Sequence, residues 1–241
     1  TQTEFKDLGV RQALAMAIDR EQLVREVDHG FGSVHAGPFS KTSWAYDATV
    51  KPLPYDPAGA KRLLLEAGWP ETREIVFSYA VSVTNLLTAA LVKKCWEEIG
   101  LKVKNESLPL TDLLYKMQKR DFDAGLMYWD GLQDPDDYSL IWESKNIPES
   151  DVRGSNFSSY QNSEVDRLFE EGRVTIDLSK RQKIYRRIHR LICEDQPVTF
   201  LESYEDIWVV HKRFHNIEPG RWVFTNVEKW YVPSGMQRYL K

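Results

Sequence analysis

Apolar residues recur at helical spacing along much of the chain. One face of the segment 10–19 collects Val10, Ala13, Leu14, Ala17 and Ile18. Residues three and four positions apart lie on the same face of a helix, so this spacing predicts an amphipathic helix. The same periodicity predicts further helices over residues 20–27, 57–67, 85–99, 111–121, 164–172 and 179–195.

Residues that favour helix ends stand at the ends of these segments. Asp56 and Pro57 fit the N-cap and the first helical position of one helix, and Gly68 follows its last turn. Asp19 and Gln22 have the spacing of a capping box at the start of the helix 20–27. The helix boundaries are therefore marked by local chemistry as well as by periodicity.

Strands are expected between the helices. Runs rich in β-branched and aromatic residues, or alternating apolar with polar residues, cover residues 73–81, 101–108, 122–129, 197–204 and 206–214. Residues 30–47 form a long, turn-rich segment that is predicted to be a loop. The alternation of strands and helices predicts an α/β sheet domain.

Composition narrows the class of protein. Hydrophobic residues make up 42% of 241 positions, which is enough for a packed core. The net charge of −4 argues against nucleic acid as a partner, and no apolar run is long enough to cross a bilayer. Eight Trp and eleven Tyr exceed the ordinary needs of a core and favour a binding surface. Cys95 and Cys193 are expected to be two buried free thiols, with a disulfide as the alternative.

Several motifs that could carry chemistry have simpler structural explanations. The glycine spacing in residues 30–37 does not match a phosphate-binding loop. His211 lies in the predicted strand 206–214 and His215 directly follows it. In extended backbone, four positions separate two side chains too widely for one metal ion. The basic residues of segment 179–190 surround an apolar stripe and are expected to be a solvated helix face. Neither a nucleophile elbow nor a cysteine motif supports catalysis.

The segment 125–140, GLMYWDGLQDPDDYSL, is the strongest candidate for a site. It follows a buried strand, and ligands of open α/β sheets gather at the carboxyl ends of strands. Asp130, Asp134, Asp136 and Asp137 lie here beside Trp129. Two explanations stay open for the aspartates, a ligand site and a cap for the helix that follows. For Trp129 the alternatives are ligand contact and packing at the rim.

Several stretches, taken in order, resemble one known family. They are residues 10–24 (VRQALAMAIDREQLV), 43–69, 122–138 (FDAGLMYWDGLQDPDDY), 158–172 (SSYQNSEVDRLFEEG) and 181–201. Together they are similar to the second half of the oligopeptide- and dipeptide-binding proteins of ABC importers, the extracellular solute-binding proteins of family 5.

The resemblance implies a fold and a role. Residues 1–241 would be the C-terminal lobe of a two-lobed periplasmic-binding-protein-like fold, with a central mixed sheet flanked by helices. The N-terminal lobe and the export signal would lie outside this chain. The full-length protein would be periplasmic or lipid-anchored at the outer face of the cytoplasmic membrane. It would bind a peptide or another small solute in the cleft between its lobes and deliver it to the permease subunits. It would need no cofactor or metal and perform no catalysis.

The resemblance also assigns roles to residues. Trp129 matches a tryptophan that lines the pocket of peptide binders, and Leu132 stands where those proteins carry the aspartate that pairs with the α-amino group of the peptide. Asp130 is the alternative counter-ion, while Trp44 and Asp134 complete the expected ligand-binding residues. The departure at Leu132 leaves other solutes open, because relatives also carry nickel chelates and sugars. Two rival functions are the sensor domain of a transcription regulator and a carboxylate-dependent hydrolase.

Overall fold

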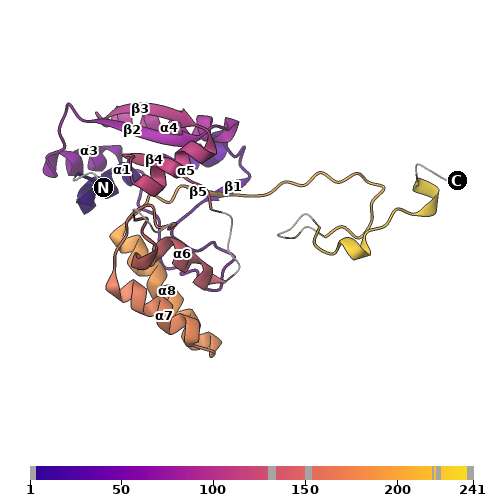
Figure 1. The fold of residues 1–241 in the computed structure, drawn as a ribbon. Helices are drawn as coiled ribbons and strands as arrows, with labels where there is room; N and C mark the ends of the chain where they lie inside the picture. The colour runs from indigo at the N-terminus through magenta and orange to yellow at the C-terminus, as the bar shows by residue number, and fades with distance from the viewer. Residues whose placement is uncertain (1–3, 130–133, 150–153, 219, 221–223, 238–241) are drawn as a thin grey trace. The chain divides into compact units, whose positions relative to one another are not determined.

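The structure is a computed structural model that describes residues 4–129, 134–149, 154–218, 220 and 224–237. The chain divides into two compact units, Thr1–Tyr204 and Glu205–Lys241. The first unit contains all of the named strands and α-helices of the described residues (Figure 1).

Three parallel strands form the main sheet of the first unit. They are β2 (Glu74–Ala80), β3 (Lys102–Leu108) and β4 (Ala124–Leu126), in the spatial order β3-β2-β4. Helix α4 (Val83–Glu98) connects β2 to β3, and α5 (Leu110–Lys119) connects β3 to β4. Parallel neighbours require such crossover helices, and the predicted α/β class is confirmed.

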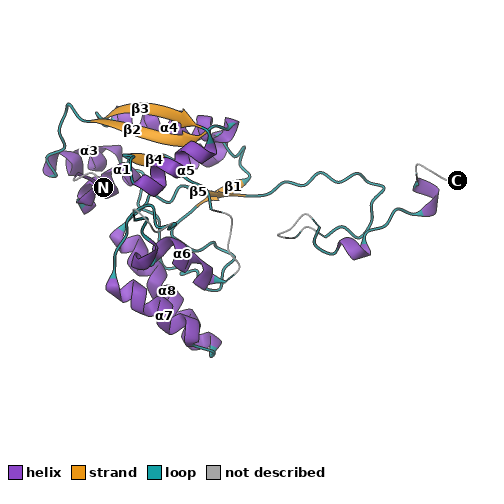
Figure 2. Ribbon diagram, viewed as in Figure 1, coloured by secondary structure: helices purple, strands orange, loops and turns teal. Residues whose placement is uncertain are grey.

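A short antiparallel ribbon accompanies this sheet. Strand β1 (Gly32–Val34) pairs with β5 (Glu202–Tyr204), and Ser33 lies opposite Ser203. The sequence prediction of a loop over residues 30–47 is therefore wrong at β1. Parallel and antiparallel strands occur in the fold as expected, but they are distributed over two sheets (Figure 2).

The start of the chain forms the helices α1 (Leu8–Met16), α2 (Arg20–Glu26) and α3 (Pro57–Glu66). Of these, α2 and α3 begin at the predicted caps. The Asp19 carboxylate accepts a hydrogen bond from the backbone N–H of Gln22, as an N-cap should. The reciprocal bond of a capping box is replaced by a bond from the Gln22 amide to Glu26, one turn further along α2. Asp56 caps α3 in the same way as Asp19 caps α2.

The first hydrophobic core lies where α1, α3 and α4 pack with the parallel sheet. Phe77 and Trp96 contact each other there with ring centroids 5.3 Å apart. The indole N–H of Trp96 donates to the Leu14 carbonyl at 3.0 Å, so this polar atom is satisfied inside the core. Cys95 is buried in the same core. Both cysteines are free thiols, as the sequence predicts, but Cys193 is only partly buried.

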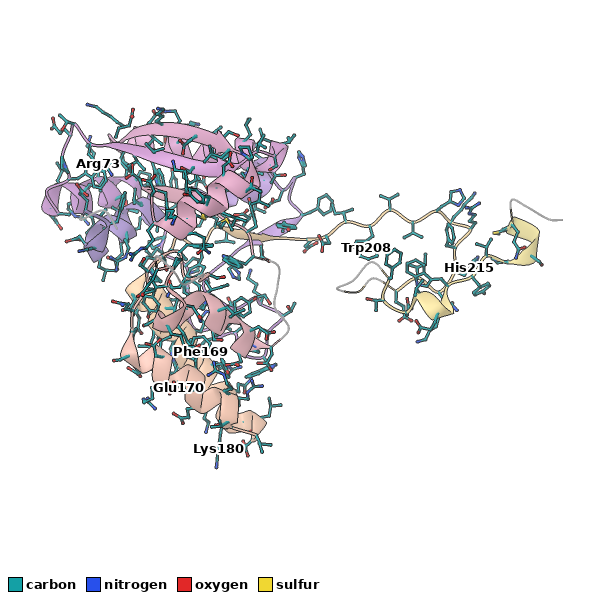
Figure 3. All side chains as sticks on the ribbon, in the orientation of Figure 1. Arg73, Phe169, Glu170, Lys180, Trp208 and His215 are labelled. Carbon is teal, nitrogen blue, oxygen red and sulfur yellow. The ribbon has the colours of Figure 1, made fainter. Side chains whose placement is uncertain are left out.

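A second core lies among the later helices of this unit. Helices α6 (Ser139–Trp142), α7 (Ser163–Val174) and α8 (Leu178–Asp195) surround the buried rings of Phe169 and Tyr185. Figure 3 marks Phe169 at this position, and Lys180 at the start of α8 is exposed. The short 3-10 helices of the unit are Glu4–Lys6, Pro135–Tyr138 and Ser144–Asn146.

The second unit has little regular structure within its described residues. It holds two 3-10 helices, Val227–Lys229 and Ser234–Met236, and an isolated antiparallel bridge between His215 and Tyr231. The predicted strand 206–214 is wrong, because this segment is not hydrogen-bonded to a partner strand, and Val209 is 96% exposed. The predicted strands 122–129 and 197–204 exist but are shorter than expected, since only β4 and β5 are paired within them.

Candidate functional site

Exposed apolar residues follow the carboxyl ends of all three parallel strands. Val81 comes directly after β2 and is 68% exposed, and Leu110 begins α5 two positions after β3 and is 54% exposed. Trp129 comes three positions after β4 and is 44% exposed. The carboxyl ends of parallel strands meet at one edge of a sheet, where α/β proteins bind their ligands. This edge is therefore the candidate binding surface.

Trp129 does not stand alone at this edge. Its ring lies against Phe157, with centroids 6.2 Å apart and planes inclined by 26°, which is a stacked arrangement. Phe157 is half-buried and comes from the loop before α7, about thirty positions further along the chain. The two rings form an aromatic pair, one member of which the sequence analysis missed. No local pattern marks a phenylalanine in a loop as the neighbour of a distant tryptophan.

Tyr128, which directly precedes Trp129, is hydrogen-bonded to the buried carboxyl group of Glu202. The Tyr128 hydroxyl donates to Oε1 of Glu202 at 3.1 Å and lies 3.4 Å from the hydroxyl of Thr88. The ring of Tyr128 also meets that of Tyr204, with centroids 5.9 Å apart. Strand β5 thus brings Glu202 next to the exit of β4, which the sequence analysis did not foresee.

The surroundings of Glu202 favour its protonated form. Burial, and then the nearby charge of Asp28, raise the pKa of Glu202 to about 7. Burial also raises the pKa of Asp28. Glu202 Oε2 and Asp28 Oδ2 are buried without a hydrogen-bond partner among the described residues. An unpaired buried carboxyl group is less costly when it is neutral, so burial and the nearby charge of Asp28 act in the same direction on Glu202.

Asp134 caps a helix, which is one of the two roles that the sequence allows for it. Its side chain accepts from the backbone N–H of Asp136, and the Asp137 carboxylate accepts from the backbone N–H of Asp134. The two bonds form a capping box for the 3-10 helix Pro135–Tyr138. Both carboxylate oxygens also bind Arg181, at 2.7 and 2.8 Å. Although burial alone would raise it, these hydrogen bonds lower the pKa of Asp134.

Trp44 belongs to the same cluster as Asp134. The guanidinium carbon of Arg181 lies 5.2 Å from the ring centroids of both Trp44 and Tyr185. The Tyr185 hydroxyl donates to Asp136 at 3.0 Å. Arg181 therefore joins two of the expected binding residues, Trp44 and Asp134, on the surface of the second core. Asp130 and Leu132 lie outside the described residues.

Two further features bear on chemistry at the surface. Across the described ranges, no group of three or more His, Cys, Asp or Glu side chains is arranged to hold a metal ion. The same part of the chain contains no helix that is both long and apolar enough to span a membrane. What the candidate edge presents is exposed aromatic surface, which suits binding of a solute that carries apolar groups.

Comparisons with known proteins give this geometry a context. The family described as Bacterial extracellular solute-binding proteins, family 5 Middle, matches residues 1–148. The Oligopeptide-binding protein AppA of Bacillus subtilis is 32% identical, over 95% of this chain and 44% of that protein. Di/tripeptide-binding protein 1 of Pseudomonas aeruginosa is also 32% identical, over 83% of this chain and 37% of that protein.

The fold agrees with these relatives. The solved structure of AppA from Bacillus subtilis in complex with a nonapeptide superposes with a TM-score of 0.79 at 29% identity, covering 96% of this chain and 48% of that chain. This chain thus spans less than half the length of the relatives that it matches. The matching of most of the chain to one family, in sequence and in fold, establishes that it belongs to the bacterial extracellular solute-binding proteins of family 5.

Proposed function

We propose that this chain is part of the substrate-binding component of an ABC importer and that the full-length protein binds peptides. The observation that carries the proposal is the agreement of the chain with peptide-binding relatives in sequence and in fold. AppA is named an oligopeptide-binding protein, and its solved structure contains a nonapeptide. Members of the family are binding proteins, so the solute is held and passed to permease subunits without a chemical step.

The proposed architecture is a clamp of two lobes. Residues 1–241 come from the C-terminal half of the protein, and the first unit, Thr1–Tyr204, forms the body of the C-terminal lobe. The solute lies between this lobe and an N-terminal lobe outside this chain. Closing two lobes around a solute excludes water and adds contacts from the second lobe. The proposed location of the full-length protein is the periplasm, or the outer face of the cytoplasmic membrane by way of a lipid anchor.

Trp129 is the proposed contact residue of this lobe. It is exposed at the carboxyl edge of the sheet, where a ligand would meet it. Asp130 and Leu132 follow it in the chain and belong to the same proposed site. Asp134 and Trp44 are proposed to serve the site through Arg181, which contacts both of them.

The absence of an aspartate at Leu132 restricts how a peptide amino group is recognised. A buried ammonium needs a carboxylate partner, because an unpaired charge is costly to bury. Asp130 is the nearest candidate in sequence, and Glu202 is a second candidate, since it lies beside the residue that precedes Trp129. N-acetylation of a peptide is expected to weaken its binding only if one of these carboxylates pairs with the peptide's α-ammonium group.

Isothermal titration calorimetry of the full-length protein tests the function. Peptides of two to nine residues should bind, and Trp129→Ala should weaken the best of them by about 1–3 kcal/mol, the scale of a buried aromatic contact. Trp69→Ala serves as the matched control, because that indole packs on Phe5 in the first core. Failure of every peptide to bind the folded wild-type protein would contradict the proposal.

A further inference from the structure

Phe157 comes from a distant loop and lies against Trp129, the proposed contact residue. The rings of Phe157 and Trp129 stack with centroids 6.2 Å apart. We propose that Phe157 is a positioning residue for Trp129 and that the two rings form one wall that receives an apolar side chain of the bound peptide. This inference rests on the proposed peptide-binding function and adds a second loop to the site.

The loop that carries Phe157 is built around a buried asparagine. Asn156 is fully buried, and its amide makes four hydrogen bonds. The Nδ2 group donates to the carbonyls of Glu143 at 3.2 Å and Tyr160 at 2.9 Å. Oδ1 accepts from the backbone N–H of Tyr160 at 3.0 Å and from the Ser158 hydroxyl at 3.0 Å. Every hydrogen-bonding position of the side chain is thus used, which fixes the loop shape around Phe157.

The same loop is tied to two other elements. The backbone N–H of Asn156 donates to the carbonyl of Asn146 at 3.0 Å. The Gln118 amide, in the last turn of α5, donates to the Gly154 carbonyl at 2.6 Å. A Cβ atom at Gly154 would lie only 1.9 Å from the Asn146 carbonyl oxygen, so this close approach requires glycine. The backbone before Phe157 is therefore held from both the 3-10 helix Ser144–Asn146 and α5.

A fixed loop beside an exposed indole has a consequence for binding. An exposed Trp129 side chain loses rotamer freedom when a solute packs on it, and that loss weakens binding. A ring that already stacks on Trp129 removes part of this freedom beforehand, which is preorganisation. It also widens the apolar surface from one ring to two. Both effects favour peptides with large apolar side chains over peptides with little apolar surface.

The test compares two series of peptides with the full-length protein. Alternating Ala-Leu peptides and alternating Ala-Gly peptides of two to nine residues carry the same terminal charges and differ in apolar surface. Phe157→Ala should weaken the best Ala-Leu peptide about 3- to 10-fold, the scale of an aromatic pair, and should weaken the matched Ala-Gly peptide less. Phe157→Leu keeps a large apolar side chain but not the flat ring, and its effect should lie between those of the wild type and Phe157→Ala.

A double-mutant cycle distinguishes positioning from a general structural role. If Phe157 acts through Trp129, the effects of Phe157→Ala and Trp129→Ala on Ala-Leu affinity will not add. Phe5→Ala is the control, because Phe5 packs on Trp69 with centroids 5.8 Å apart and should leave the preference for Ala-Leu peptides unchanged. Urea unfolding of each variant separates loss of binding from loss of folding.

The outcomes separate this inference from the proposed function. If Trp129→Ala weakens binding while both Phe157 variants bind as the wild type does, the positioning role is wrong and the peptide-binding function stands. Strict additivity of the two alanine substitutions overturns it as well. If the folded wild-type protein binds neither series, the function itself fails and the inference fails with it.

Discussion

Replacing Arg181 tests the cluster that this residue forms with Asp134, Trp44 and Tyr185. Its Nη1 and Nη2 atoms bind both carboxylate oxygens of Asp134, at 2.8 and 2.7 Å, and Nε donates to the Gly172 carbonyl at 3.0 Å. The guanidinium carbon lies 5.2 Å from the ring centroids of Trp44 and Tyr185. The Arg181 side chain is 20% exposed, so most of these contacts are shielded from water. Arg181→Ala removes all of them together.

The expected loss follows from the individual contacts. The Asp134 side chain is 42% exposed, so the ion pair is counted near the upper end of surface pairs, at about 1 kcal/mol. The two cation–π contacts add about 0.5–1 kcal/mol each at partly exposed sites. The free energy of unfolding should therefore fall by about 2–3 kcal/mol. Arg181→Lys keeps the charge but loses the planar fork, and we expect about half of that loss.

Urea unfolding followed by circular dichroism measures this change. With a slope of about 1–3 kcal/mol per molar urea, the midpoint for Arg181→Ala should fall by about 1 M. Arg167→Ala is the control, because Arg167 and Glu171 form an exposed pair one turn apart that is expected to contribute about 0.3–0.5 kcal/mol. An Arg181→Ala midpoint indistinguishable from that of Arg167→Ala would refute the idea that Arg181 anchors this cluster.

Two further predictions concern pH. Burial lowers the pKa values of His35 and His189 to about 4, from about 6.5 in the unfolded chain. Between these pH values the unfolded state binds more protons than the folded state. The free energy of unfolding therefore falls as the pH drops from 6.5 to 4, by about 3 kcal/mol for each histidine. Urea titrations at a series of pH values should show a smaller fall for His189→Leu than for the wild type. His211→Gln, at an exposed position, should leave the fall unchanged. If His189→Leu and the wild type lose stability equally with falling pH, His189 is not a source of the effect. The raised pKa of Glu202 acts in the opposite sense, because the folded state binds the extra proton, and stability falls as the pH rises from 4.5 to 7. Glu202→Gln should abolish that part of the profile, and an unchanged profile would exclude Glu202 as its source.

The helices were predictable because their signals are local. Periodicity and caps such as Asp56 and Asp19 act within one or two turns, and both caps form the expected backbone hydrogen bonds. The strands were less predictable because a strand is stabilised by a partner elsewhere in the chain. Strand β1 pairs with β5 across about 170 positions, which no local pattern reveals. Residues 206–214 show strand-like composition but lack a paired strand, and they are not extended into a sheet.

The candidate site was predictable only where a residue's position depends on nearby sequence. Trp129 could be placed because it follows a strand, and its position there needs only local information. Asp134 could be given two roles from its sequence context, and the structure shows the capping role directly. Phe157 and Glu202 were missed because their importance comes from side chains that meet only after folding. Their burial and their contacts with Trp129 and Tyr128 depend on packing between distant segments.

The most direct test of the clamp compares residues 1–241 with the full-length protein. Two hydrophobic cores lie within the first unit, so the isolated chain is expected to fold. It should bind peptides poorly, because a solute on one lobe keeps only part of its contacts and stays open to water. If the missing lobe supplies half of a micromolar binding energy, about 4 kcal/mol is lost and the dissociation constant rises to about 1 mM. Titration calorimetry of both proteins with the same peptide should show micromolar binding only for the full-length protein, and micromolar binding by the folded isolated chain would contradict the clamp.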